Sequence, residues 1–337
     1  MNINKILAIL LLFGFAYTST MKRTHDDAFE QKKVKAVHAS FSRKKARAIP
    51  AISQEVLDAV PAITEEVLDA VPAIDVEYEI LLKLINSTTI NDFEEQLQQL
   101  DVNQLINVFN LIDKPLDVSR KTHLHKAVLN RNLIAIENLK RLGANPNVKN
   151  LSGKTPLHLA AKTFPESIEK LIEMGANVNA KDSNGFTPLM IASEFNNASI
   201  QLLVKAGTDV NAKDNDGSTS LMMAAATNTA AVQPLIHARA DVNAKDNYGS
   251  TPLMFAIEHN TAAMQPLIQA GADVNAKDND GSTPLMIAVE SNTEAIQPLI
   301  QAGADIDAED NQGWTALKIA AQRNQEAIKY LMKPSTA

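Results

Sequence analysis

The side chains of this chain that could carry chemistry are its histidines, aspartates and methionines, because the sequence contains no cysteine. Disulfides, thiolate metal sites and cysteine nucleophiles are therefore excluded. His123 and His125 form an H-x-H pair, which could bind a metal, but both stand where the helix of a repeating unit is expected to begin. A structural role for His125 is the favoured interpretation, and we expect no metal site there.

Two D-x-D pairs resemble part of a calcium loop, namely Asp214-Asp216 and Asp278-Asp280. A calcium site needs six or more oxygen ligands, and neither pair has a dense enough set of neighbouring oxygens. We therefore expect these aspartates to be solvated at the tips of turns. The sequence also has no recognisable Ser-His-acid triad, Walker loop or dinucleotide-binding loop. It predicts a protein that is not an enzyme and that holds no metal and no cofactor.

The elements that must position these residues recur every 32 residues. Six glycines stand at this constant spacing, each two residues before a threonine: Gly153, Gly185, Gly217, Gly249, Gly281 and Gly313. A repeat of this length is one supersecondary unit that cannot bury its own apolar face, so that neighbouring units must stack. The pattern predicts an elongated scaffold that offers a large surface.

Residues 281–312 show the unit most clearly. Thr283 stands at an N-cap position and Pro284 at the first helical position, where its missing N–H is harmless. Asn292 turns the chain into a second helix, and Gly303 can end that helix in a left-handed conformation. Asn-Gly and Asp-Gly pairs then predict a tight turn between successive units.

This unit resembles the ankyrin repeat. The segments TPLHLAA at 155–161, GANVNAKD at 175–182 and GADVNAKD at 271–278 are close to the most recognisable segments of that family. The resemblance implies an all-α solenoid with short β-hairpin loops, preceded by a small helical region. It also implies about seven helix-turn-helix units, starting near residues 118, 151, 183, 215, 247, 279 and 311. The first unit is degenerate, and the last is expected to cap the array.

The chain departs from the ankyrin pattern in the length of units two to six, which are one residue shorter than usual. The missing residue falls in the turn between the two helices. A second departure is the motif histidine, which is kept only at His125 and His158. We expect its hydrogen bond to the motif threonine to be lost wherever a thioether fills the space instead. The replacements are Met190, Met222, Met254, Met286 and, in the last unit, Lys318.

A third departure is the proline that recurs inside the second helix, as Pro234, Pro266 and Pro298. Proline in a helix interior removes one backbone hydrogen bond and costs about 3 kcal/mol. Three copies in phase indicate a place that tolerates proline, within the first turn or so of a shortened helix. We therefore expect a kink or a late start of the helix at these three positions.

The first 20 residues resemble an export signal. Lys5 supplies a positive charge, and residues 6–15 form an apolar stretch (ILAILLLFGF) that is followed by small and polar residues. An apolar run of about ten residues is too short to span a bilayer, which takes ~20, but it suits a signal peptide. We expect residues 1–20 to be removed and the chain to be exported, to the periplasm or outside the cell, with no membrane span left. An uncleaved tether is the alternative.

Three segments are expected between this signal and the repeat array at 118–333. Residues 21–49 are basic and indicate a disordered spacer, although KKVK and RKKAR could also serve as nuclear-localisation or nucleic-acid patches. Residues 50–74 hold the 11-residue repeats PAISQEVLDAV and PAITEEVLDAV, which form a semi-ordered linker or dock through their Val and Leu side chains. Residues 75–117 predict three acidic helices that could cap the array, with Asn91 or Asp92 starting the second helix.

The net charge of −7 conceals a strong alternation along the chain. Residues 22–47 carry +6, residues 48–117 carry −12, residues 118–213 carry +6, and residues 214–337 carry −8. Such asymmetry bears on partners rather than on the fold. It predicts that the last four repeats prefer a partner with a basic surface. Nucleic acid is not expected, because few aromatic residues accompany the basic segments.

The resemblance to ankyrin proteins implies binding through the hairpin tips and the concave face of the first helices. The candidate partner-binding residues are Phe186, Asp216, Tyr248, Asp280, Gln312 and Trp314 at the tips, and Phe195 and His259 on first helices. Phe164, Glu290 and Arg323 are further candidates on first helices. The three tip aromatics either anchor a partner, as exposed aromatics often do, or pack on a neighbouring hairpin.

The sequence therefore predicts a non-catalytic, exported scaffold that binds a protein partner and no small-molecule substrate. Two alternatives stay open. One is a secreted effector that acts inside a host cell, with RKKAR (residues 43–47) directing it to a nucleus. The other is a self-associating structural protein, in which oppositely charged blocks of two copies meet.

Overall fold

A computed structural model describes residues 71–332 of the chain. The chain divides into two compact units, Met1–Leu111 and Ile112–Ala337. The expected signal at 1–20, the basic segment at 21–49 and nearly all of the 11-residue repeats lie outside the described residues. The division falls after Leu111 rather than after residue 117, where the sequence placed it.

The described part of the first unit contains three helices: α5 (Val71–Asn86), α6 (Ile90–Gln98) and α7 (Val102–Leu111). Helix α5 takes in the last residues of the range 50–74, because Pro72 lies in its first turn, where no backbone N–H is needed. The N-cap of α6 is Thr89, not Asn91 or Asp92; its hydroxyl oxygen accepts the Asp92 N–H at 3.0 Å. The expected capping of the array by this unit stays a prediction.

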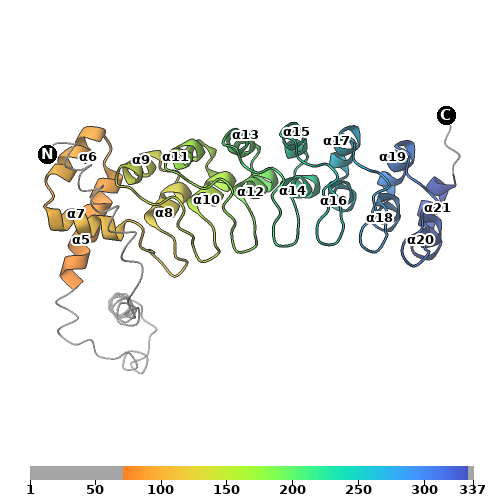
Figure 1. Cartoon of the computed structure of the whole chain (residues 1–337), viewed down its shortest axis with the longest axis horizontal. Coiled ribbons are helices and arrows are strands. Elements are labelled where there is room, and N and C mark those ends of the chain that lie inside the picture. Colours follow the sequence, from red (N-terminus) through yellow and green to blue (C-terminus); the bar gives the residue numbers. More distant parts are fainter. Residues whose placement is uncertain (1–70, 333–337) are drawn as a thin grey trace, which may run out of the picture. The chain divides into compact units, whose positions relative to one another are not determined.

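The second unit is a row of helix pairs, and in each pair a first helix is followed by a second one (Figure 1). The first helices are α8 (His123–Leu129), α10 (Pro156–Thr163), α12 (Pro188–Phe195), α14 (Ser220–Thr227), α16 (Pro252–His259), α18 (Pro284–Ser291) and α20 (Ala316–Arg323). The second helices are α9 (Leu133–Arg141), α11 (Ile168–Glu173), α13 (Asn197–Lys205), α15 (Thr229–His237), α17 (Met264–Gln269), α19 (Ile296–Gln301) and α21 (Gln325–Leu331). Figure 1 shows that the two kinds of helix form two rows, with the long loops projecting beside the first helices.

These helices begin where the sequence predicts. Thr187 and Thr283 are N-caps whose side chains accept a backbone N–H, and the prolines that follow them occupy the first helical position. The core runs along the whole row, since Leu157, Leu189, Leu221 and Leu253 are fully buried at the same position of four successive first helices. Each repeat thus completes the core of its neighbour, as the 32-residue period requires.

The shortened turn between the two helices is built around one asparagine. Asn196 ends α12 and at the same time caps α13, accepting the Ala198 N–H at 3.2 Å. In a later repeat the Asn292 side chain reaches back and donates to the Ile257 carbonyl at 2.8 Å and to the Thr261 hydroxyl at 2.7 Å. The asparagine at this position therefore pairs with backbone groups at the ends of both helices and with the neighbouring repeat. These pairings explain how the turn can be one residue shorter.

The recurring prolines are accommodated in two ways. Pro266 and Pro298 lie in the first turn of α17 and α19, which start late, after the short 3-10 turns η2 (Thr261–Ala263) and η3 (Thr293–Ala295). There the missing N–H has no helical partner to lose. Pro234 instead lies inside α15, so the expectation of a first-turn position is wrong for this repeat. The late start is not caused by proline alone, because η1 (Pro165–Ser167) precedes α11 as well.

The second unit is all-α in the residues that the structure describes. The expected β-hairpin loops are turns without strands, and one isolated antiparallel bridge joins Glu309 and Thr315. Hydrogen bonds within and between the loops nevertheless hold their backbone in place.

Candidate protein-binding surface

Each loop between repeats is closed by a side chain that accepts backbone hydrogen bonds, which is Asn150 in the first of these loops and an aspartate in the later ones. Asp214 Oδ1 accepts from the N–H groups of Asp216 at 2.9 Å and Ser218 at 2.8 Å. Burial raises the pKa of Asp214, and these hydrogen bonds oppose that shift. Asp278 makes the same contacts with Asp280 and Ser282. Only the second aspartate of each D-x-D pair is therefore a free tip residue, and the first is part of the loop.

Successive loops are joined by a ladder of asparagines. The Asn247 N–H donates to the Asp216 carbonyl at 2.9 Å, and the Asn247 side-chain amide donates to the Asn215 carbonyl at 3.1 Å. Asn279 repeats both contacts one loop further on, with Tyr248 and Asn247. These asparagines are engaged within the array, so they hold the tips in place rather than offer free amides to a partner.

The loops approach each other so closely that only glycine fits beside the ladder. Gly249 has a φ of +81°, and a Cβ at this position would lie 2.7 Å from the Asn279 backbone nitrogen. A second ladder consists of lysines, each donating from its ammonium group to a carbonyl of the next repeat. It comprises Lys149, Lys181, Lys213, Lys245 and Lys277, at 2.6 to 2.7 Å.

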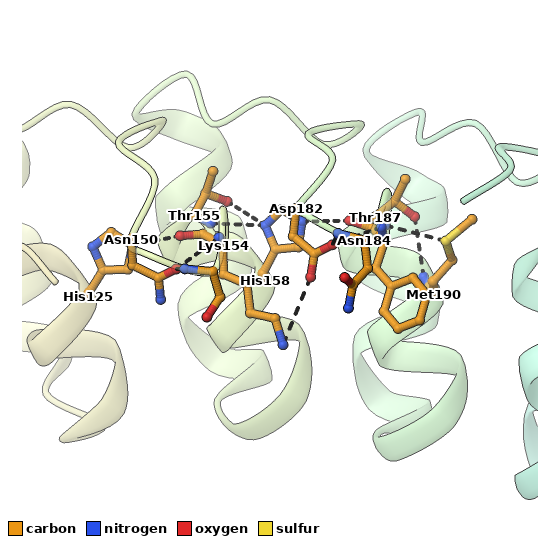
Figure 2. A network of polar contacts seen from close by, with 11 residues as sticks. His125, Asn150, Lys154, Thr155, His158, Asp182, Asn184, Thr187 and Met190 are labelled. Atoms are coloured by element: carbon orange, nitrogen blue, oxygen red, sulfur yellow. Dashed lines mark hydrogen bonds and ion pairs between the residues drawn. The ribbon is translucent and has the colours of Figure 1, made fainter. Parts of the chain in front are cut away.

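The motif histidines and methionines are buried. Figure 2 shows three of them, His125, His158 and Met190, at this position of successive repeats. His158 Nδ1 accepts the Thr155 N–H at 3.1 Å, while Nε2 lies 2.9 Å from the Phe186 carbonyl of the next repeat. Burial lowers the pKa of His158 to about 4, although the contact with Phe186 acts in the opposite direction. His158 is thus a neutral structural bridge between two repeats.

The expected loss of the threonine contact in the methionine repeats is wrong. The sulfur of Met190 lies 3.4 Å from the Thr187 backbone nitrogen and accepts its N–H, in the place where His158 Nδ1 stands in the repeat before (Figure 2). Thioether sulfur is a weak acceptor, which is why sequence reasoning overlooked it. A methionine has no second polar group, however, so nothing replaces the bridge from Nε2 to the next repeat.

Three of the predicted tip residues occupy the same position in successive loops. Tyr248 is 67% exposed, and Asp216 and Asp280 are exposed in the loops on either side of it. The backbone of all three is fixed by the ladder described above. Gln312 is exposed at the equivalent position of the last loop, where its N–H donates to Asp310. The structure therefore brings these four predicted residues into one row.

The other two tip aromatics are only partly accessible. Phe186 and Trp314 are half-buried, and the backbone carbonyl of each accepts the N–H of the aspartate that closes its loop. Phe186 also lies next to the buried bridge from His158. These two side chains are therefore less free than Tyr248 to meet a partner.

The predicted first-helix residues fall into two groups. Phe195 is 50% exposed, with the Lys162 ammonium group 3.8 Å from the centre of its ring, and His259 is exposed beside Phe255, at 6.4 Å between ring centres. By contrast, Phe164 is buried, so its assignment to the binding surface is wrong. Phe164 follows α10 at the position that Asn196 holds after α12 in the next repeat, in the turn between the two helices.

Two further features bear on binding. Glu290 and Arg323 form an ion pair with each other between α18 and α20, which reduces the charge that either offers to a partner. Sequence reasoning missed Val118 and Leu151, which are 88% and 67% exposed at the tips of the first two loops. The signal that could have revealed them is the tip position they share, because the later repeats place asparagine there.

In the residues that the structure describes, no group of three or more His, Asp or Glu side chains is arranged to hold a metal ion. A search of the same residues finds no helix with the length and apolar character needed to cross a membrane.

Comparisons with known proteins agree with this architecture. Residues 124–214, 196–278 and 259–337 each match the family described as ankyrin repeats (3 copies). The chain is also similar to the crystal structure of the ankyrin repeat domain of Bcl-3, described as a unique member of the IkappaB protein family. That similarity has a TM-score of 0.56 and 33% sequence identity, and covers 63% of this chain and 99% of the other. No curated protein sequence matches the chain.

Proposed function

The chain belongs to the ankyrin-repeat family, whose repeats bind protein partners, and we propose that it is an exported, non-catalytic scaffold that recognises a partner with a basic surface. The observation that supports this proposal most directly is the row formed by Asp216, Tyr248 and Asp280. These three residues differ from the repeating pattern around them while their backbone is held by it. The proposal thus rests on a rigid frame that presents variable side chains.

The chemistry of this row favours a cationic partner group. The face of a tyrosine ring attracts lysine or arginine, and the effect is worth about 0.5–1 kcal/mol at an exposed site. Carboxylates in the two adjacent loops add electrostatic attraction, and residues 214–337 carry a net charge of −8. Because the ladder fixes the loop backbone before binding, little ordering entropy is lost when a partner docks.

A binding experiment with three full-length proteins tests this proposal. The natural chain, Tyr248→Ala and the double variant Asp216→Lys/Asp280→Lys serve as baits for partners from the compartment in which the chain occurs. We expect the alanine variant to weaken capture about tenfold, the range of a moderate hot spot. The charge-reversed variant should lose capture and the natural chain should bind less at high salt.

The choice of variants follows from the loop contacts. Asp246 is unsuitable for charge reversal, because its carboxylate accepts the Tyr248 and Ser250 N–H groups and closes the loop. Asn279→Ser serves as a control, since it changes the ladder next to Tyr248 without changing the charge. Equal capture by the natural chain and the two test variants would rule out this row as the binding surface.

Export is proposed from residues 1–20 alone, which have the order of charge, apolar run and small residues of a signal peptide. Fractionation of the producing cells, with sequencing of the mature N-terminus, tests it. We expect a mature chain that starts at residue 19 or residue 21 outside the cytoplasm. An intact N-terminus in the cytoplasmic fraction would contradict export.

A second candidate function is that of an effector inside a host cell. The observation in its favour is the basic run RKKAR at residues 43–47. A fluorescent fusion of the chain without residues 1–20, compared with its RKKAR→AAAAA variant, decides this point. Nuclear accumulation that depends on the basic run would support the effector, and exclusion of both fusions from the nucleus would remove it.

A further inference from the structure

We infer that the loop tips of the first two repeats form a second docking surface, and that its occupant is the acidic, aliphatic segment 50–71 of a second copy of this chain. This surface lies at the N-terminal end of the array, in other loops than the row formed by Asp216, Tyr248 and Asp280. The inference goes beyond the proposed function and does not depend on it.

The surface is marked by two exposed aliphatic side chains on adjacent loops. Val118 is 88% exposed and Leu151 is 67% exposed, and the Leu151 N–H donates to the Ser119 carbonyl at 2.8 Å, which places the two tips side by side. Four of the later loops carry asparagine at this tip position, where its side chain donates to the preceding loop. Leu151 lacks that side-chain contact, and both Val118 and Leu151 present apolar side chains to solvent on adjacent loops.

These aliphatic side chains stand among cations that few acids neutralise. Arg120, Lys121 and Lys149 have no carboxylate within ion-pair distance among the described residues, and Lys154 reaches only Asp182, at 4.0 Å. The first loop holds two acids. Asp113 accepts the Asn145 N–H, and Asp117 is occupied in part by the Ser119 N–H and hydroxyl group and the Lys121 N–H. The docking surface is therefore both apolar and positively charged.

The positive charge on the second helices of the same repeats is neutralised instead. Lys140 pairs with Glu173 at 2.6 Å, and Lys170 pairs with Glu137 at 3.1 Å, both between α9 and α11. The excess positive charge of residues 118–213 is thus concentrated on the loop side. A partner for this side needs negative charge together with aliphatic side chains.

The chain itself contains such a segment. Residues 50–71 hold five acidic residues and no basic one, and each of the two 11-residue copies carries two valines and a leucine. The acidic loops of residues 214–337 are also opposite in charge to the docking surface, but their tips are polar, and the large exposed apolar group there is the aromatic ring of Tyr248 rather than an aliphatic side chain. Charge and apolar character together select the segment 50–71.

Sedimentation velocity on the full-length chain tests the inference. We expect association that strengthens with concentration and weakens at least about tenfold between ~0.05 M and ~0.5 M salt, where the Debye length falls severalfold. The double variant Val118→Asn/Leu151→Asn should weaken association about tenfold or more. It is matched to the fold, because asparagine occupies this tip position in four later repeats.

A synthetic peptide with the sequence of residues 50–71 identifies the occupant. This peptide should compete with self-association, and a peptide in which its five acids are replaced by glutamine or asparagine should not. A chain that stays monomeric at every concentration, or an association that the asparagine variant or the natural peptide leaves unchanged, would overturn the inference. Tyr248→Ala should leave the association intact, which separates this surface from the one proposed for partner binding.

Discussion

The Nε2 atom of His158 lies 2.9 Å from the carbonyl oxygen of Phe186, which belongs to the next repeat. His125 makes the same contact with the Lys154 carbonyl at 3.0 Å. The four following repeats place methionine at this position, and the sulfur of Met190 accepts a hydrogen bond from the threonine of its own repeat. The side-chain bridge therefore ties together the first repeats of the array and is missing from the junctions that follow.

Replacing Met190 with histidine should extend this bridge by one junction. In the variant Met190→His, Nε2 would face the Ser218 carbonyl, which now accepts only the Asp214 N–H. We expect a gain of about 1 kcal/mol in the free energy of unfolding, the usual net value of one hydrogen bond. Urea unfolding of the variant and the natural chain measures it. A loss of stability would show that thioether packing outweighs the bridge.

The free energy of unfolding should fall as the pH falls through the range in which the protonation of His158 differs between the folded and the unfolded chain. Its pKa is lowered to about 4 in the folded chain, whereas an unfolded histidine titrates near 6.5. Between these values the unfolded chain binds more protons, so that stability is full above about pH 6.5 and is lost toward pH 4. At about 1.36 kcal/mol per pKa unit, His158 accounts for up to about 3 kcal/mol. Burial lowers the pKa of His125 in the same direction.

The control for this pH dependence is His158→Met, a residue that four later repeats hold at the same place. Thermal unfolding between pH 4 and pH 7 should show a flatter profile for the variant than for the natural chain. The variant should also be less stable near pH 7, because it loses the bridge to Phe186. If the stabilities of the two proteins changed in parallel with pH, the assignment of this pH dependence to His158 would be wrong.

Because the loops approach each other closely, we expect alanine substitution to cost unequal amounts of stability at two glycines. In Gly249→Ala the new methyl group would meet the Asn279 backbone at 2.7 Å, whereas Gly271→Ala meets no atom within 4 Å. Both variants pay about 1–2 kcal/mol for a positive φ. Gly249→Ala should cost clearly more and should increase amide exchange at Asn279, and equal costs in chemical denaturation would show that the loops separate easily.

Replacing the prolines at the two kinds of position should change the stability of the array in opposite directions. Pro234→Ala restores a backbone N–H inside α15 and should stabilise the array by about 1 kcal/mol, because an interior helical hydrogen bond becomes available. Pro266→Ala, in the first turn of α17, gains no such bond and should be neutral or slightly destabilising through the freer unfolded chain. Calorimetry of both variants distinguishes these outcomes.

Sequence reasoning predicted the repeating frame because that frame depends on local rules. Threonine caps, proline at the first helical position and the 32-residue spacing of glycine fix the helix starts and the stacking without knowledge of neighbours. It failed at two kinds of side-chain contact. Phe164 occupies the position of Asn196 but is buried. Within its own repeat, the sulfur of Met190 accepts the Thr187 N–H, a weak hydrogen bond that sequence reasoning did not expect.

The candidate site likewise has features that the sequence predicts and features that it does not. The tip position of Asp216, Tyr248 and Asp280 could be predicted, since it follows from the turn residues. That the asparagines beside them are occupied could not, because a ladder between loops is a contact across 32 residues. The exposure of Val118 and Leu151 was equally hidden, since an aliphatic residue is ordinarily assigned to the core.

The ladder has a consequence for how such a chain can change through time. The contacts between loops recur with the 32-residue period, so the ends left by excising one whole repeat are again a natural pair. Recombination between repeats can therefore delete or duplicate the loop that bears Tyr248 and leave each junction chemically complete. The order of the tip residues, and with it the choice of partner, can be rearranged without redesigning the fold.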